Sequence, residues 1–122
     1  MPTIPQPGAP VRGSQSGRPI MALFDLLGRR WAMGVLWNLS ETGPSTFRAL
    51  QAACDTISPA VLNTRLKELQ AAGLVTKGAA GYEVSEIGRE VYAGLLPLSE
   101  VSKRWAGRLN AERQQEPTTA AS

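Results

Sequence analysis

The chain has 122 residues and a formal net charge of +3, from 13 Lys and Arg against 10 Asp and Glu, and 43% of its residues are hydrophobic. This length suits one domain, and this apolar fraction excludes wholesale disorder. The sequence has no His, and its single cysteine is Cys54, which excludes His-dependent nucleophiles, a His/Cys zinc site and an internal disulfide. We therefore expect no cofactor, no metal and no enzymatic activity.

No apolar run approaches the length of a membrane span, and the N-terminal residues lack the apolar stretch of a secretory signal. We expect no membrane partner and a cytoplasmic location.

Both ends of the chain are poor in large apolar side chains. Residues 1–19 are rich in Pro and Gly, so we predict a disordered arm, and residues 114–122 are small and polar and predict a disordered tail. Arg12 and Arg18 are the only charged residues of the arm. A solubilising arm is the simpler interpretation, and an arm that reaches a DNA minor groove is the alternative.

Residues 20–113 have the apolar spacing of a folded domain that begins with three helices. The first helix ends at Gly28 and has the apolar stripe Ile20, Leu23, Phe24 and Leu27. The second ends near Gly43-Pro44 and has the stripe Ala32, Val35, Leu36 and Leu39. The third starts after a cap at Ser45 or Thr46 and is predicted to bury Phe47, Leu50 and Cys54.

A fourth helix is predicted over residues 58–72, because Ser58-Pro59 combines an N-cap residue with proline at the first helical position. Its apolar stripe is Leu62, Leu66 and Leu69. It ends at Gly73, with Leu74 placed for the hydrophobic contact of a glycine C-cap.

Residues 74–85 predict a β-hairpin, since two short β-type runs flank Gly78-Ala79-Ala80-Gly81. A last helix follows from Glu86 to about Arg113, and Pro97 is expected to kink or divide it. Its narrow apolar seam suggests a partner chain. The fold class is therefore mainly α with a small β-hairpin, in the order of a winged helix-turn-helix.

A helix-turn-helix places its second helix in the DNA major groove. Opposite the leucine stripe of residues 58–72 lies a face of small, polar or basic side chains that suits base edges and phosphates. Arg65 lies beside the stripe and suits either an acidic neighbour or DNA. The candidate DNA contacts are Ser45, Thr46, Arg48, Ser58, Pro59, Ala60, Asn63, Thr64, Arg65, Lys67 and Lys77.

Several motifs resemble the HxlR family, a MarR-like class of bacterial winged-helix regulators. They are Leu26-Leu27-Gly28-Arg29-Arg30-Trp31, Gly43-Pro44 before Thr46 to Leu50, Ile57-Ser58-Pro59, Arg65 to Leu69, Gly73-Leu74-Val75, and Pro97 with Trp105. The resemblance implies a homodimer that binds promoter DNA, with dimer contacts from the first and last helices. The interface residues that we assign on this basis are Ile20, Leu23, Phe24, Leu95, Leu98, Val101 and Trp105.

The chain departs from the family pattern at four places. Arg18 stands where members that sense oxidants often carry a cysteine before a proline, so redox sensing is not inferred. The hairpin is short and its tip has no Lys or Arg, and Thr46 stands where a basic residue is usual. The segment from Gly88 to Pro97 is longer than usual by about one helical turn.

Three alternatives remain open from the residues alone. A winged-helix module that binds a protein instead of DNA competes with the regulator, because exposed basic residues are few. Cys54 is expected to be a buried, inert thiol, although a sensor role is the alternative. The three tryptophans are expected to be packing anchors, although they could line a pocket for a small-molecule effector, which the sequence leaves unidentified. The operator and the direction of regulation are likewise left open.

Overall fold

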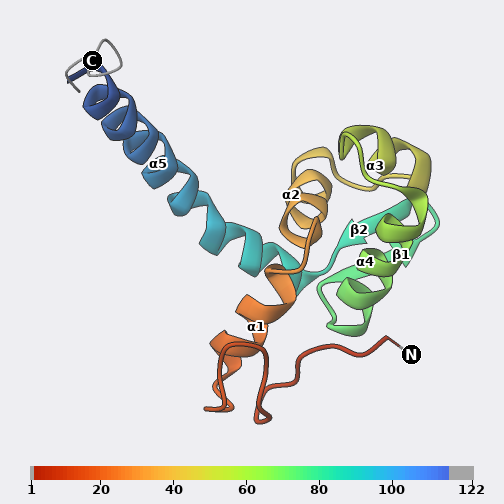
Figure 1. Cartoon of the computed structure of the whole chain (residues 1–122). Coiled ribbons are helices and arrows are strands. Elements are labelled where there is room, and N and C mark those ends of the chain that lie inside the picture. The colour runs from red at the N-terminus through yellow and green to blue at the C-terminus, as the bar shows by residue number, and fades with distance from the viewer. Residues whose placement is uncertain (1, 116–122) are drawn as a thin grey trace. The chain divides into compact units, whose positions relative to one another are not determined.

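The computed structural model describes residues 2–115, and its elements follow the predicted order (Figure 1). They are α1 (Pro19–Leu27), α2 (Ala32–Thr42), α3 (Phe47–Ala53), α4 (Pro59–Ala71), β1 (Val75–Gly78), β2 (Gly81–Val84) and α5 (Glu86–Gln115). The predicted class, mainly helical with one small hairpin, is confirmed. The chain divides within α5: residues up to Glu90 form one compact unit, and residues from Val91 onward form the second.

The core of the first unit lies between α2 and α4. Leu36 and Leu39 of α2 and the leucines of α4 have no exposed surface, so the predicted stripes of both helices are confirmed. In α1 Ala22, Leu26 and Leu27 are buried, whereas Ile20 and Phe24, which are expected at a dimer interface, are 44% and 56% exposed. In α3 Leu50 is buried and Phe47 is only half-buried.

Both ends of α4 have the predicted caps. The Ser58 hydroxyl accepts a hydrogen bond from the Val61 N–H at 3.2 Å. At the other end, Gly73 has φ +78°, its N–H donates to the Gln70 carbonyl, and the Leu74 N–H donates to the Leu69 carbonyl. This pair of bonds is a Schellman motif, which satisfies carbonyls that the helix end would leave unpaired. The start and the end of α4 are thus set by local chemistry.

The hairpin pairs Val75 with Val84 and Gly78 with Gly81, and Ala79-Ala80 forms its two-residue loop. The segment before α3 joins this sheet, because Ser45 and Tyr82 exchange backbone hydrogen bonds of 2.9 and 2.8 Å. The wing is therefore attached to the start of α3, close to the helix-turn-helix pair.

The first turn of α5 is anchored at the base of the hairpin. The Ser85 hydroxyl donates to the Gly73 carbonyl and accepts from the Gly88 N–H at 3.1 Å. Gly88 is buried so tightly that a Cβ there would lie 2.2 Å from the Leu74 carbonyl oxygen. The base of the wing and the start of α5 are thus held at one point.

Of the two outcomes expected at Pro97, a kink or a division, the division does not occur, because α5 is one helix from Glu86 to Gln115. Proline removes one N–H from the ladder, and the carbonyl left without a partner belongs to Ala93, which is exposed to water. The tail predicted over residues 114–122 was wrong at its start, because Gln114 and Gln115 are helical. Residues 116–122 lie outside the described part.

The composition predicts disorder for residues 1–19, whereas residues 2–18 have defined turns in the structure. The Gly8 N–H donates to the Gly17 carbonyl at 2.8 Å, and Val11 and Ser14 form an isolated bridge. The backbone N–H of Arg12 also donates to the Asp25 carboxylate at 3.2 Å. The start of the winged helix-turn-helix domain at residue 20 stays a prediction.

Gly81→Ala should destabilise the domain by about 1–3 kcal/mol, because the added Cβ would overlap the segment before α3. Gly81 has φ +115°, and its Cβ would lie 2.3 Å from the Ser45 carbonyl oxygen. Urea denaturation measures the change. Gly78→Ala is the matched control on the opposite strand, because its Cβ would meet its nearest atom at 3.6 Å. Equal loss of stability in both variants would contradict the proposed tie between wing and α3.

Candidate nucleic-acid interface

One face of α4 is exposed and carries small, polar or basic side chains. It consists of Ala60, Asn63, Thr64, Lys67 and Ala71, opposite the buried leucines, as the periodicity predicts. Asn63 offers an amide donor and acceptor, and Lys67 is in none of the ion pairs of residues 2–115. The Thr64 hydroxyl donates to the Ala60 carbonyl at 3.0 Å, which leaves its oxygen lone pairs and its methyl group for a ligand. This set of groups matches the chemistry of base edges.

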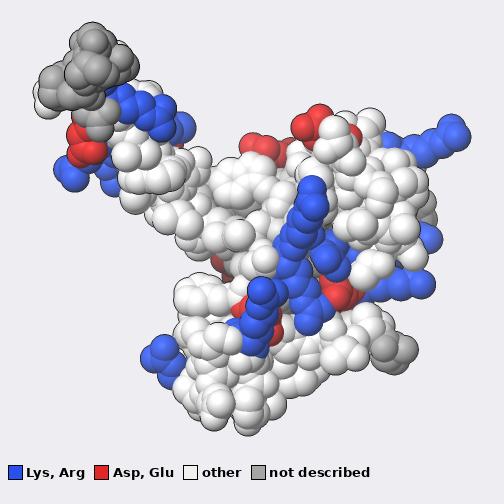
Figure 2. All heavy atoms as spheres, viewed as in Figure 1, with Lys and Arg blue, Asp and Glu red and all other residues white. Residues whose placement is uncertain are grey.

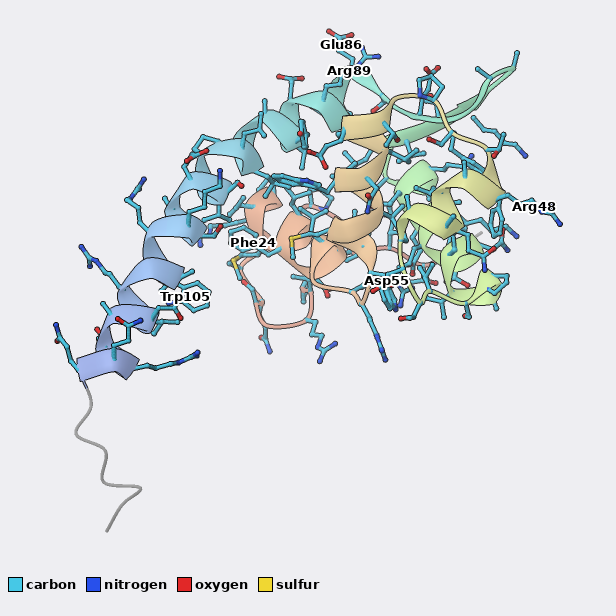
Figure 3. The ribbon with its side chains drawn as sticks, turned by 90° about the horizontal axis from the view of Figure 1, so that it is seen from above. Phe24, Arg48, Asp55, Glu86, Arg89 and Trp105 are labelled. Atoms are coloured by element: carbon cyan, nitrogen blue, oxygen red, sulfur yellow. The ribbon has the colours of Figure 1, made fainter. Side chains whose placement is uncertain are left out.

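The N-terminus of α4 lies next to this face. Ser58, Pro59 and Ala60 are exposed. Pro59 has no N–H and the Val61 N–H is bonded to the Ser58 hydroxyl, so the backbone N–H that the first turn can offer to an anion is that of Ala60. Thr46 caps α3 by accepting the Ala49 N–H at 3.1 Å, and Arg48 extends away from α3 into open space (Figure 3). These groups suit the phosphates on either side of a groove.

Ser45 does not belong to the exposed set, which corrects its assignment as a DNA contact. It is 9% exposed, and its hydroxyl donates to the Gly43 carbonyl at 3.0 Å. Its backbone is paired with Tyr82, so the residue joins the wing to the domain.

Lys77 is the basic residue of the hairpin. Its ammonium lies 5.2 Å from the ring centroid of Tyr82, its partner on β2. Such a cation–π contact orients the lysine while leaving it exposed to solvent. The loop residues Ala79 and Ala80 add no charge, so the wing presents one cation.

Arg65 takes the first of its two expected roles, because it pairs with an acidic neighbour. Its Nη1 donates to Glu68 Oε1 at 2.8 Å, and its Nε donates to the Arg30 carbonyl at 2.7 Å. Arg29, which precedes α2, donates to the other oxygen of Glu68. The sequence analysis did not identify this group of Arg29, Arg65 and Glu68. The i,i+3 spacing of Arg65 and Glu68 was a usable signal, whereas Arg29 is too distant in the chain to be found that way.

The distribution of charge agrees with these contacts. Figure 2 shows Lys and Arg atoms crowded together with acidic atoms where α1 meets the helix-turn-helix, while other Lys and Arg side chains project singly from the side that carries α3 and the hairpin.

Within residues 2–115, two residues other than glycine have positive φ, Trp31 at 74° and Asp55 at 63°. Asp55 lies in the turn between α3 and α4, where aspartate tolerates this conformation (Figure 3). For Trp31 the conformation costs about 1–3 kcal/mol and needs support from its surroundings. The Arg30 guanidinium lies 5.6 Å from the Trp31 ring centroid, and the Arg30 carbonyl accepts from Arg65.

Cys54 is buried, as expected for an inert thiol. Burial raises the pKa of the Cys54 thiol, and a hydrogen bond from the Asn38 side chain opposes that effect. Because the thiolate is the reactive form, the net raised pKa lowers reactivity near neutral pH.

Two further candidate features are missing from the described part of the chain. None of the helices within residues 2–115 is long and apolar enough to cross a membrane. The acidic and cysteine side chains of the same residues form no group of three that could hold a metal ion.

Comparison with known proteins gives consistent matches. The model of the HxlR-like helix-turn-helix family matches residues 26–110. An uncharacterized HTH-type transcriptional regulator of Halalkalibacterium halodurans is 36% identical over 59 residues, which cover 48% of this chain and only about half (52%) of that relative's length.

Two solved structures match the fold. The quinone-bound YodB of Bacillus subtilis is 28% identical with a TM-score of 0.60, over 73% of this chain and 96% of that one. A "possible HxlR family transcriptional factor" of Thermoplasma volcanium is 25% identical with a TM-score of 0.64, over 72% and 84%. The predicted winged helix-turn-helix fold is thereby confirmed.

The Cys54 thiol should react with an alkylating reagent at pH 7.5 roughly 100-fold more slowly in the native protein than in urea, because it reacts only when the structure opens. The native rate should rise as the pH increases toward the raised pKa of the thiol. Mass spectrometry of quenched samples measures both rates. Equal rates in native and unfolded protein would contradict the burial of Cys54.

Proposed function

The chain belongs to the HxlR-like helix-turn-helix family of transcriptional regulators, and we propose that it is a dimeric regulator that binds double-stranded DNA in a sequence-specific manner. In this proposal α4 enters the major groove and the hairpin is a short wing beside it. The protein acts by binding and not by catalysis. A regulator of this kind works where the chromosome is, so we place it in the cytoplasm.

The exposed face of α4 is the observation that carries this proposal. Asn63 can form two hydrogen bonds with an adenine edge, and the Thr64 methyl group can contact a thymine methyl. Ala60 is small enough to let the helix approach the bases closely.

Phosphate contacts supply the remaining affinity. We assign them to Arg48, Lys67 and Lys77, together with the Ser58 end of α4 and the Thr46 hydroxyl. Each cation that neutralises a phosphate releases counterions, so binding should weaken steeply with salt. Three cations in one subunit are few, and a dimer doubles that number.

Exposed apolar side chains support the dimer. In α1, Ile20 and Phe24 are 44% and 56% exposed, and in α5 Leu98 and Trp105 are 59% and 62% exposed. Figure 3 shows the Trp105 side chain projecting from α5. Large apolar residues repeated along one helix face mark a surface that a partner covers. We assign the interface to Ile20, Leu23, Phe24, Leu95, Leu98, Val101 and Trp105.

The wild-type chain should prefer a duplex selected from a random pool, or from the DNA upstream of its own gene, over a scrambled duplex by about 10³-fold or more. Asn63→Ala should lower affinity for the selected duplex by about 1–3 kcal/mol and leave scrambled-duplex binding unchanged, because only base contacts are lost. Fluorescence anisotropy measures both affinities.

Asn110→Ala, at an exposed asparagine of α5, is the matched control and should bind like the wild type. Absence of DNA binding by the wild-type chain, even at low salt, would contradict the proposed function and favour a protein-binding module.

Trp105→Glu should dissociate the dimer and weaken subunit association by about 2 kcal/mol or more, because it places a charge on the apolar seam. Sedimentation equilibrium measures the change in mass. Asn110→Glu adds the same charge to an exposed position off the seam, so it should leave the dimer intact. A dimer that survives the Trp105 change would move the interface away from α5.

A further inference from the structure

Two arginines beside the exposed face of α4 have their guanidinium groups engaged within the domain. Glu68 uses both carboxylate oxygens, since Oε1 accepts from Arg65 Nη1 at 2.8 Å and Oε2 accepts from Arg29 Nη1. Each arginine also donates to a backbone carbonyl, Arg65 to Arg30 at 2.7 Å and Arg29 to Thr3 at 3.1 Å. We call Arg29, Arg65 and Glu68 the Glu68 cluster.

The ion pairs of the Glu68 cluster are largely shielded from solvent, unlike ordinary surface ion pairs. Glu68 is only 7% exposed, and the side chains of Arg29 and Arg65 are 25% and 20% exposed. A carboxylate buried this deeply needs charged partners, because its desolvation is costly without them. Moving either arginine away from Glu68 would therefore be energetically costly.

The position of the cluster on α4 matters for DNA. At about 100° per residue, Glu68 lies roughly 40° around the helix from Thr64, at the edge of the exposed face. Arg65 lies further toward the buried leucines. Lys67 lies on the exposed face itself and takes no part in the ion pairs of residues 2–115.

We propose that Glu68 sets the DNA specificity of this chain without touching DNA, by holding Arg29 and Arg65 away from the phosphate backbone. The inference rests on the proposed DNA-binding function. Non-specific affinity grows with the number of cations that reach phosphates. Keeping two arginines away from the phosphates lowers the affinity for DNA of every sequence, while the base contacts of Asn63 and Thr64 are kept. The bonds from Arg65 also tie α4 to the linker before α2, which keeps the exposed face in position.

Glu68→Gln is the direct test, because it removes the charge and keeps the shape. Binding to a random-sequence duplex should become tighter at low salt. The slope of log affinity against log salt should steepen by about 1–2 for each subunit, as the freed arginines reach phosphates. The ratio of specific to non-specific affinity should fall about tenfold. Adding Arg65→Gln to this variant should reverse about one unit of the slope.

Arg65→Gln and Lys67→Gln are a matched pair of single substitutions in the wild-type chain. Each removes one positive charge from α4, and the two positions are two residues apart. Lys67→Gln should make the slope shallower by about one for each subunit, whereas Arg65→Gln should leave it unchanged. A simple loss of stability would not produce this difference. If Glu68→Gln fails to fold in a urea titration, this pair decides the question.

The proposal is overturned if Glu68→Gln binds the random duplex with an unchanged or shallower slope, or if Arg65→Gln lowers the slope as much as Lys67→Gln does. If either result is found and the wild-type chain still binds its selected duplex, the proposal about Glu68 is wrong and the proposed function is retained. A wild-type chain that binds no DNA overturns both.

Discussion

The packing of α2 against α4 is the constraint on which the rest of this domain depends. The two helices are in contact, and Leu36, Leu39, Leu62, Leu66 and Leu69 have no exposed surface. Burial of a leucine is favourable by about 1.5–3 kcal/mol, so α4 cannot rotate about its axis without large loss. That fixed rotation is why Asn63, Thr64 and Lys67 point outward together. The candidate reading face is thus a consequence of the core on its other side.

The surroundings of α4 restrain it further at its ends and along one flank. Ser58 defines where the helix begins, and the Schellman motif at Gly73 defines where it ends and sends the chain into the wing. The Glu68 cluster holds its flank against the linker before α2. Ser45, buried between the wing and α3, brings the hairpin into the same unit. Each of these contacts uses polar groups that would be costly to leave unpaired, so each is specific as well as stabilising.

The proposed DNA-binding surface of α3, α4 and the hairpin carries few exposed cations. Arg48, Lys67 and Lys77 are exposed, whereas Arg29 and Arg65 are occupied. Counterion release strengthens binding to every sequence alike, so a surface with fewer phosphate contacts depends more on Asn63 and its neighbours. In the proposed dimer both kinds of contact are doubled.

The sequence by itself determined the order of elements, the buried stripes of α2 and α4, the caps of α4 and the hairpin, because these follow from periodicity and from residues that act on their near neighbours. It also identified the exposed face of α4, since burying one side of a helix exposes the other. Only the tertiary structure decided between the two expected roles of Arg65 and gave those of Ser45 and Gly81. Their deciding contacts are with the Arg30 carbonyl, with Tyr82 and with the backbone of Ser45, all distant in the chain. The continuity of α5 through Pro97 was likewise settled only there, where the exposure of Ala93 to water becomes visible. Contacts between residues far apart in the chain leave no periodic signal, so they become visible only once the chain has folded.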